Sequence, residues 1–381
     1  MRTSLALLVS LTLLNPACSC ANAVETSDAG RVDARVDAPL MGDATTTIDA
    51  PMFATTDAAG LDAPGLDARV LANDAGSDAA SAVDAPRRAA PYPIVLAHGF
   101  FGFDDFAGVG FVRYFFNVRD DLADHGEAEV YTPAVDPFND SETRGRQLLA
   151  HIEHILAETG AAKVNIIAHS QGGLDARVVA NLRPDLIASI TTISTPHRGS
   201  RASDVLLRVI ADDRFRDLVD AMVRVIGAPI YTADGRETSV FTAIRQFSSE
   251  GIDVFNAAHP NEASVSYFSV AGRSTNRYAL SECVFSGRPD FITRWDVNLD
   301  PLEPLLTVPG AIVDDGVFLP TPNDGLVSIE SARWGRFLGC IPADHLDEVG
   351  QLLGDRAGLL NDFDYLRFYR DLVGYIRAQG F

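Results

Sequence analysis

Hydrophobic residues in the second part of the chain follow two periods in turn. Short apolar runs that suit buried β-strands alternate with stretches in which apolar residues recur every three to four positions, as on one face of a helix. The expected strands span residues 92–97, 129–135, 164–168, 186–193 and 264–272, and the expected helices span residues 112–122, 141–159, 174–182 and 359–381. This alternation predicts right-handed crossovers and a mostly parallel sheet, with ligand chemistry at the carboxyl ends of the strands.

The first residues of the chain have a different pattern. A basic start, an apolar run over residues 5–14 and small residues at 21–23 predict a secretory signal over residues 1–23, because the apolar run is too short to span a bilayer. Cleavage after the small residues is one ending of such a signal. A lipid anchor on Cys18 or Cys20 is the other, and the sequence leaves both open.

Residues 24–90 are of low complexity, with Asp-Ala pairs recurring among scattered Pro and Gly and a single aromatic residue, Phe53. Such a segment buries too little apolar surface to offset its ordering entropy, so we expect a disordered, self-repelling linker. A calcium-binding acidic repeat is the alternative, but the spacing is irregular and lacks the glycine-rich nonapeptide form. Residues 91–381 then form a single α/β domain.

Charge and cysteine content narrow the class of the protein. The formal net charge is −21, and the α/β domain is acidic too, which argues against nucleic-acid binding. No apolar run in that domain reaches membrane-spanning length. Cys283 and Cys340 are its only cysteines, and in an exported protein such a pair predicts one disulfide.

The most informative stretch of the chain is residues 164–177, in which a strand pattern runs into a turn of small residues at Ser170 and a helical pattern follows. Strand, sharp turn and helix form the context of a nucleophile elbow, in which backbone strain lifts a serine hydroxyl clear of the sheet. The turn needs small neighbours, which are Ala168 and Gly172 here. The backbone N–H of Gln171, at the positive end of the helix, can face a developing oxyanion. A strand-to-helix turn that merely contains a serine is the alternative.

Residues 201–260 interrupt the alternation of strands and helices shortly after the strand that follows the elbow. Apolar residues there share one helical face: Leu218, Val219, Met222, Val223 and Ile226. Such a face fits an ordinary helix packed on the core, and equally a mobile lid over an apolar site. We expect irregular structure from 273 to 317.

A serine nucleophile needs a base, and the base needs an acid that fixes its tautomer. In this fold class the three residues follow the order serine, acid, histidine. Among eight histidines this order selects His345, which is late in the chain and follows the acid candidates. Asp314, Asp315 and Asp324 are all candidates for the acid, and the tight Asn-Asp-Gly turn favours Asp324.

Several colinear segments resemble the secreted triacylglycerol lipases of the Pseudomonas and Burkholderia type, which have the α/β-hydrolase fold. The similar segments are residues 92–104 (YPIVLAHGFFGFD), 144–149 (RGRQLL), 163–173 (KVNIIAHSQGG), 183–189 (RPDLIAS), 196–200 (PHRGS), 249–251 (SEG), 323–327 (NDGLV) and 345–351 (HLDEVGQ). The resemblance covers the chain from residue 92 to about 353 and does not extend to residues 1–90.

The resemblance implies Ser170 as nucleophile, Asp324 as acid and His345 as base. It also implies an oxyanion hole formed by the backbone N–H groups of Phe100 and Gln171. Two departures from the family stand out. Ala168 occupies the position of a family glycine, a change of one methyl group, and Cys283 does not align with the family's first disulfide cysteine, although a Cys283–Cys340 bond is still expected.

A calcium site is also implied, with ligands from Asp300 and Asp347 and from the carbonyls of Gln351 and Asp355. Calcium prefers several hard oxygen ligands, and Asp347 follows His345 by two residues, so the ion would hold the loop of the base. Solvated surface carboxylates are the alternative for Asp300 and Asp347. The resemblance further raises a lipase-specific foldase as a partner.

We therefore expect an exported α/β-hydrolase that hydrolyses lipid esters through an acyl-enzyme intermediate, with a helical lid within residues 201–260. Phe100, Phe101 and Phe103 would line an apolar acyl groove with the lid helix, which favours acylglycerols as substrates. A short-chain carboxylesterase or polyester depolymerase is the alternative enzyme. A catalytically silent binding protein tethered at the cell surface is the alternative from another class.

Overall fold

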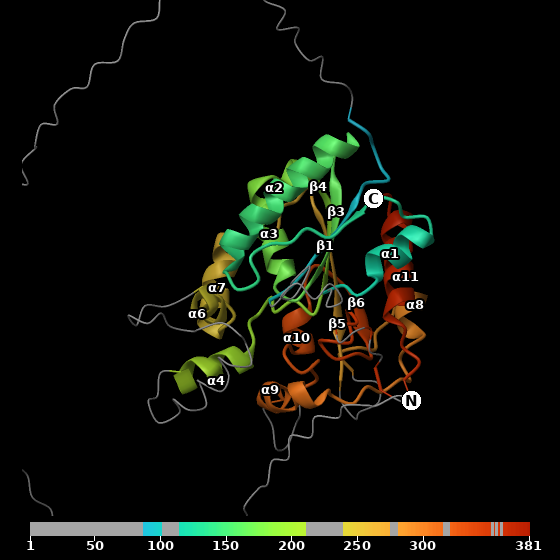
Figure 1. Ribbon diagram of the computed structural model, residues 1–381. Helices are drawn as coiled ribbons and strands as arrows, with labels where there is room; N and C mark the ends of the chain where they lie inside the picture. The colour runs from blue at the N-terminus through green and yellow to red at the C-terminus, as the bar shows by residue number, and fades with distance from the viewer. Residues whose placement is uncertain are drawn as a thin grey trace, which may run out of the picture. The chain divides into compact units, whose positions relative to one another are not determined.

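Six strands form one parallel sheet in the order β2-β1-β3-β4-β5-β6 (Figure 1). The chain leaves β1 (Ile94–Ala97) toward the edge strand β2 (Val130–Tyr131) and then returns to the other side of β1 as β3 (Val164–His169). This reversal of direction places a topological switch between β1 and β3. The carboxyl ends of strands at such a point are the usual place for a ligand site.

The computed structural model describes residues 87–100, 114–210, 239–274, 281–314 and 321–381, except residues 352, 353, 355, 356, 359 and 360. The remaining strands are β4 (Ile187–Ile193), β5 (Ser266–Gly272) and β6 (Arg336–Ile341). The helices are α1 (Val118–Asp124), α2 (Ser141–Thr159), α3 (Gly172–Leu182), η1 (Pro184–Leu186), α4 (Arg201–Ile210), α6 (Ser239–Gln246), α7 (Ser249–Ala258), α8 (Asp290–Thr293), η3 (Pro304–Leu306), α9 (Thr307–Val313), α10 (Ile329–Ala332) and α11 (Tyr365–Ala378).

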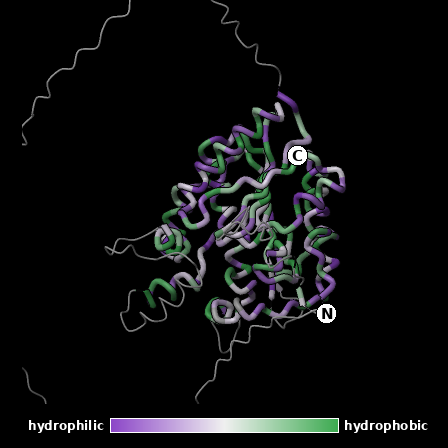
Figure 2. The backbone as a smooth tube through the Cα atoms, in the orientation of Figure 1, coloured by the Kyte–Doolittle hydropathy of each residue, from purple (hydrophilic) through white to green (hydrophobic). Residues whose placement is uncertain are grey.

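Helices cover both faces of the sheet, with α2 and α3 on one side and α1, α8 and α11 on the other (Figure 1). Alternate residues of the strands enter different cores. Val95 and Ile166 pack with Leu148 of α2, whereas Ile94 and Ile167 belong to the cluster that contains α11. Two buried faces account for the nearly continuous apolar strands, and the covering helices alternate hydrophobic and hydrophilic residues along the tube of Figure 2.

The helix expected over 141–159 forms with those bounds as α2. Asp140 caps its first turn by accepting a hydrogen bond from the Thr143 N–H, and Gly160 ends it in the left-handed conformation with φ 66°. Most of the other expected elements are present with shifted ends. The expected strand over 129–135 is much shorter, since only Val130 and Tyr131 pair with β1.

Two features differ from the sequence interpretation. The strand β6 was not predicted, because Arg336 is exposed and Gly339 interrupts the apolar run. We expected irregular structure over 273–317. This prediction is wrong where α8, η3 and α9 form. The helices α8 and η3 are only 4 and 3 residues long, too short for helical periodicity, and α9 contains a proline and a glycine.

The expected lid region, residues 201–260, contains three described helices, α4, α6 and α7. The apolar face expected at 218–226 lies outside the described residues, as do Phe101 and Phe103 and the proposed signal and most of the linker. Cys283 and Cys340 form the expected disulfide, with Cα atoms 5.3 Å apart. Within the described ranges, no helix has both the length and the apolar character needed to cross a membrane.

Candidate active site

Ser170 lies in a strained turn between β3 and α3. Its φ of 54° is in the left-handed region that residues other than glycine rarely adopt. The backbone of the turn is held on both sides, because Ser170 N–H donates to the Ile193 carbonyl at 2.9 Å and Ser170 O accepts from Thr195 Oγ1 at 2.7 Å. A Cβ on Gly172 would lie 2.3 Å from the carbonyl oxygen of Ala97, so only glycine fits there. The turn therefore has the geometry of a nucleophile elbow.

Ala168 replaces the expected glycine on the other side of the turn. Its methyl group is fully buried and belongs to the same hydrophobic cluster as Val95 and Ile166. One methyl group is thus accommodated within the core without disturbing the elbow.

His345 and Asp324, which are distant from Ser170 in sequence, form a buried pair. His345 Nδ1 lies 2.8 Å from Asp324 Oδ2, and the backbone N–H of His345 donates to the Asp324 carbonyl. The other carboxylate oxygen of Asp324 accepts from the N–H groups of Leu326 and Val327 at 2.9 and 2.7 Å. These bonds fix the carboxylate so that Nδ1 carries the proton and Nε2 is left as a base.

The His345 ring packs against His169, the residue directly before Ser170, with ring centroids 4.5 Å apart. Within the described part of the chain, the Ser170 hydroxyl makes no hydrogen bond, so the bond from serine to base is not formed in this structure. Such bonds are often long in enzymes without substrate and shorten when it binds. The structure places the His345–Asp324 pair at the elbow that carries Ser170.

Phe100 and Gln171 lie at adjacent turns. Gln171 occupies the N-cap position of α3, and its side-chain Nε2 donates a 2.8 Å hydrogen bond to the Asn139 carbonyl. Its backbone N–H donates to no acceptor among the described residues. Phe100 follows the β1 turn, where a Cβ on Gly99 would lie 2.6 Å from Ser170 Cβ. The two turns are thus close enough for both backbones to face one reacting carbonyl.

An apolar cluster extends outward from Phe100. Its ring contacts Phe138 and Phe247 edge-on, with centroids 5.9 and 6.0 Å apart. The rest of the cluster comes from α4 and α6, namely Leu206, Leu207, Ile210, Val240, Phe241 and Ile244. No residue of α4 is itself buried, although the helix is strongly amphipathic. A cluster of buried and partly buried apolar side chains therefore lies beside the candidate oxyanion residue.

Three carboxyl groups lie together beside His345 in sequence or in space: those of Asp300, Asp344 and Asp347, with one oxygen of each within 4.8 Å of the others. All three are buried, and neither carboxyl oxygen of Asp300 has a hydrogen-bond partner among the described residues. Burial raises the pKa of Asp300 to about 8, and the Asp344 carboxyl adds to the increase. Three buried carboxyl groups at this spacing, two of whose oxygens have no hydrogen-bond partner among the described residues, form a cluster of hard oxygens, which fits a divalent cation such as calcium.

Asp300 and Asp347 were expected in this cluster, but Asp344 was not. Asp344 immediately precedes His345 and accepts hydrogen bonds from the N–H groups of Glu303, Leu346 and Asp347. Gln351 is described and lies in the following turn, whereas Asp355 lies outside the described residues.

Beneath the elbow, Glu348 and His169 form a buried pair that the sequence interpretation missed. His169 Nε2 lies 2.8 Å from Glu348 Oε2, and Ser194 Oγ donates to the other Glu348 oxygen at 2.6 Å. Tyr114 Oη lies 2.6 Å from His169 Nδ1. Burial raises the pKa of Glu348 well above its ordinary value. The only sequence signal was the position of Glu348 three residues after His345, since its partners come from separate elements.

A parallel sheet with helices on both faces, a serine elbow after its third strand and a late acid–histidine pair define an α/β-hydrolase. Residues 92–225 match a family model described as alpha/beta hydrolase fold. The fold is also that of EstA from Clostridium botulinum (TM-score 0.51, 20% identity, 76% of this chain and 87% of that chain) and of Staphylococcus hyicus lipase (TM-score 0.51, 18% identity, 76% and 97%).

Sequence comparison narrows this class. The triacylglycerol lipase of Burkholderia plantarii is 34% identical over 338 residues, which cover 80% of this chain and 91% of that protein. Those of Pseudarthrobacter phenanthrenivorans and Vibrio cholerae are each 33% identical, covering 76% of this chain and 97% and 88% of their own lengths. The chain belongs to the bacterial triacylglycerol lipase family and is a carboxylic ester hydrolase.

Proposed function

We propose that this protein is an exported triacylglycerol lipase that acts through Ser170, His345 and Asp324. The observation that carries the proposal is the hydrogen-bonded His345–Asp324 pair beside the Ser170 elbow. Its tautomer leaves Nε2 free to accept a proton, which is what a serine hydroxyl needs to become a nucleophile.

In the proposed reaction, Ser170 Oγ attacks the ester carbonyl while His345 Nε2 takes the hydroxyl proton. The N–H groups of Phe100 and Gln171 stabilise the charge that develops on the carbonyl oxygen. The C–O bond to the alcohol then breaks, and His345 gives its proton to the departing alcohol. Water next attacks the acyl-enzyme, with His345 as base again, and releases the fatty acid and the free Ser170 hydroxyl.

Long-chain acylglycerols are the proposed substrates, because the apolar cluster of Phe100, α4 and α6 offers a surface for an acyl chain beside the oxyanion turn. We include in the proposal a lid formed within residues 201–260. The helix α4 is amphipathic and has no buried residue. These two properties support the lid, because the apolar face of such a helix can leave the protein surface and contact a lipid surface instead.

A panel of esters tests the substrate class. Emulsified long-chain triglyceride is expected to be hydrolysed at least about tenfold faster per enzyme than the same type of ester below its solubility limit, because an oil surface stabilises the open lid. The measurement is acid release at constant pH, with a soluble short-chain nitrophenyl ester as reference. Equal rates on dissolved and emulsified ester would contradict the lid, and activity on short esters alone would favour a carboxylesterase or polyester depolymerase.

We propose a structural calcium ion at the acidic cluster, held by Asp300 and Asp347, with Asp344 nearby and Gln351 and Asp355 as the further ligands that the family resemblance implies. The two unpartnered Asp300 oxygens support this assignment. When bound, the ion would neutralise the buried carboxylates and brace the turn that carries His345.

Removal of calcium is expected to destabilise the protein. Chelation should lower the melting temperature by about 5–10 °C, because an ion that binds only the native state stabilises it by mass action. Thermal unfolding of the full chain in chelator and in excess calcium measures the difference. Asp300→Asn should abolish the calcium-dependent increment, while Asp290→Asn, an exposed aspartate on α8, should retain it. An unchanged melting temperature on chelation would rule out the site.

Export completes the proposal. Residues 1–23 would direct secretion, with an anchor on Cys18 or Cys20 as the alternative to a free protein, and residues 24–90 would act as a spacer. A lipase-specific foldase is the proposed folding partner. Mass spectrometry of the mature amino terminus distinguishes cleavage after residue 23 from lipid attachment.

A further inference from the structure

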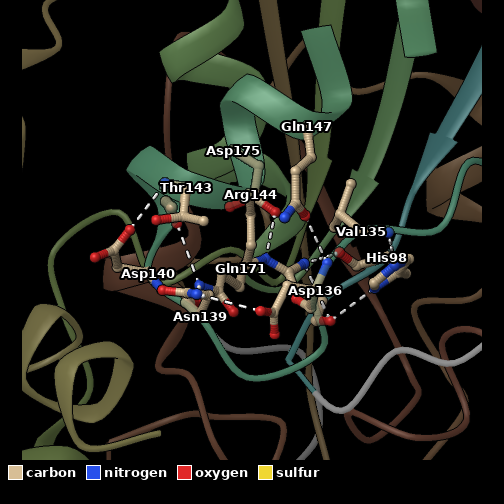
Figure 3. A network of polar contacts seen from close by, with 12 residues as sticks. His98, Val135, Asp136, Asn139, Asp140, Thr143, Arg144, Gln147, Gln171 and Asp175 are labelled. Atoms are coloured by element: carbon tan, nitrogen blue, oxygen red, sulfur yellow. Dashed lines mark hydrogen bonds and ion pairs between the residues drawn. The ribbon is translucent and has the colours of Figure 1, made fainter. Parts of the chain in front are cut away.

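Arg144 is a fully buried arginine on α2 whose guanidinium lies in the centre of a polar network beside the β1 turn (Figure 3). It forms an ion pair with Asp175 of α3, with Nε 2.8 Å from Asp175 Oδ2. Its two terminal nitrogens donate to backbone carbonyls: Nη1 to Asp136 at 2.6 Å, and Nη2 to His98 at 2.6 Å and Gly99 at 3.2 Å. The side chain thus connects the elbow helix to the turn that precedes Phe100.

A buried guanidinium is costly unless each of its donors finds an acceptor and its charge is compensated. The Asp175 carboxylate compensates the positive charge of Arg144. The carbonyls of Asp136, His98 and Gly99 accept hydrogen bonds from the guanidinium N–H groups, whose directions are fixed by the planar group. Burial raises the pKa of Asp175 to about 6, and Arg144 acts in the opposite direction. This arrangement favours arginine over lysine, whose single ammonium group cannot reproduce a planar fork.

Arg144 contacts the one peptide whose orientation decides where the Phe100 N–H points. The carbonyl oxygen and the N–H of a trans peptide point in opposite directions within one plane. The Gly99 oxygen accepts from Arg144 Nη2 and from His98 Nδ1 at 3.0 Å, so the N–H of Phe100, at the other end of this peptide, is directed away from Arg144.

His98 strengthens the same constraint. Because Nδ1 donates to Gly99, Nε2 is the acceptor for the Val135 N–H at 3.1 Å, as Figure 3 shows. Burial and the adjacent positive charge of Arg144 lower the pKa of His98 to about 4, so the ring stays neutral. The same hydrogen bonds therefore fix the tautomer of His98 and the conformation of the turn at Gly99.

We infer that Arg144, held in place by Asp175, is a positioning residue of the oxyanion hole, which orients the Gly99–Phe100 peptide toward the charge that develops on the substrate carbonyl. The inference rests on the proposed function, in which the Phe100 N–H is an oxyanion donor. It differs from a purely structural role, in which the ion pair would only join α2 to α3.

Variants of Arg144 separate the two roles. Arg144→Lys keeps a positive charge opposite Asp175, and Arg144→Met combined with Asp175→Asn removes both charges, so that neither is left buried alone. Arg177→Met is the matched control. Arg177 is also buried and donates to Asn256 Oδ1 and the His259 carbonyl at 2.8 and 2.6 Å, but none of its described bonds reaches the β1 turn.

In steady-state kinetics on a soluble nitrophenyl ester, the Arg144 variants should have a lower kcat and a nearly unchanged KM. The double variant is expected to lose about a hundredfold in kcat with KM within about twofold of wild type, because misplacing one oxyanion donor affects mainly the transition state. Arg144→Lys is expected to lose about tenfold in kcat. Arg177→Met should lower the melting temperature comparably and leave kcat within about threefold.

Two results would overturn the inference: a folded double variant with wild-type kcat, or a kcat loss in Arg177→Met equal to that of the Arg144 variants. If the double variant does not fold, Arg144→Lys decides, since wild-type kcat there would reject the inference. Wild type and Ser170→Ala are measured in parallel. Absence of Ser170-dependent turnover would reject the proposed function together with the inference, whereas normal wild-type turnover with insensitive Arg144 variants would reject the inference alone.

Discussion

Ser170→Ala is expected to lower ester turnover by about four to six orders of magnitude while leaving the fold intact, because the covalent route through the acyl-enzyme is lost. Alanine is compatible with the packing, since the Ser170 hydroxyl makes no hydrogen bond within the described residues and the turn is held through its backbone. Residual activity above the uncatalysed rate would come from the oxyanion hole and from substrate binding. Initial rates on a soluble nitrophenyl ester and the thermal melting temperature measure the two properties separately.

Ser189→Ala is the matched control for this substitution. Ser189 is a buried serine of β4 that donates to Asn165 Oδ1 at 2.7 Å, away from the carboxyl ends of the strands. It should cost stability and little activity. A Ser170→Ala variant with wild-type turnover would remove Ser170 from the mechanism and favour another nucleophile. A wild-type protein without any ester turnover would instead support the silent surface-binding alternative.

The second large effect is expected at His345. His345→Ala should lower kcat by about the same four to six orders of magnitude, because without the base the serine hydroxyl keeps its proton. The same nitrophenyl ester assay measures it. His151, which lies exposed on α2, provides the control, and His151→Ala should retain wild-type kcat.

The double variant Ser170→Ala/His345→Ala tests whether the two residues act together in one catalytic step. Groups that act together give non-additive losses, so the double variant should be no slower than either single variant, to within about threefold. Additive losses would mean that the two residues act independently and would contradict the shared proton transfer. A small effect of His345→Ala alone would show that another group serves as the base.

Much of the candidate site follows from local sequence pattern. The elbow was recognisable because strand periodicity, small residues around Ser170 and helical periodicity all occur within fourteen consecutive positions, 164–177. The structure adds the positive φ of Ser170 and the close approach of Gly172 to Ala97, both of which that pattern anticipated. The chain order selected His345, whereas the tight Asn-Asp-Gly turn and the family resemblance favoured Asp324 over Asp314 and Asp315. The structure joins Asp324 and His345 by a 2.8 Å contact.

Other site residues carry no local signal. Arg144 is one charged residue within the helix expected over 141–159, and its partners come from α3 and from the turn after β1. Glu348 and Asp344 flank His345 in sequence, yet their roles depend on partners such as His169 and Glu303 on separate elements. A charged side chain in sequence looks the same whether it is solvated or buried with a partner, so the prediction could not separate these cases.

The amino-acid sequence by itself determined the alternation of strands and helices, the nucleophile elbow, the family and the acidic character of the protein, and it predicts export. These properties depend on residue types at short range or in fixed order along the chain. Only the tertiary structure decided that β6 completes the sheet, that Asp344 joins Asp300 and Asp347, and that Arg144 reaches the turn after β1. The physical reason is that burial and partnership of a polar group are set by which distant segments pack together, and packing has no local signature in the chain.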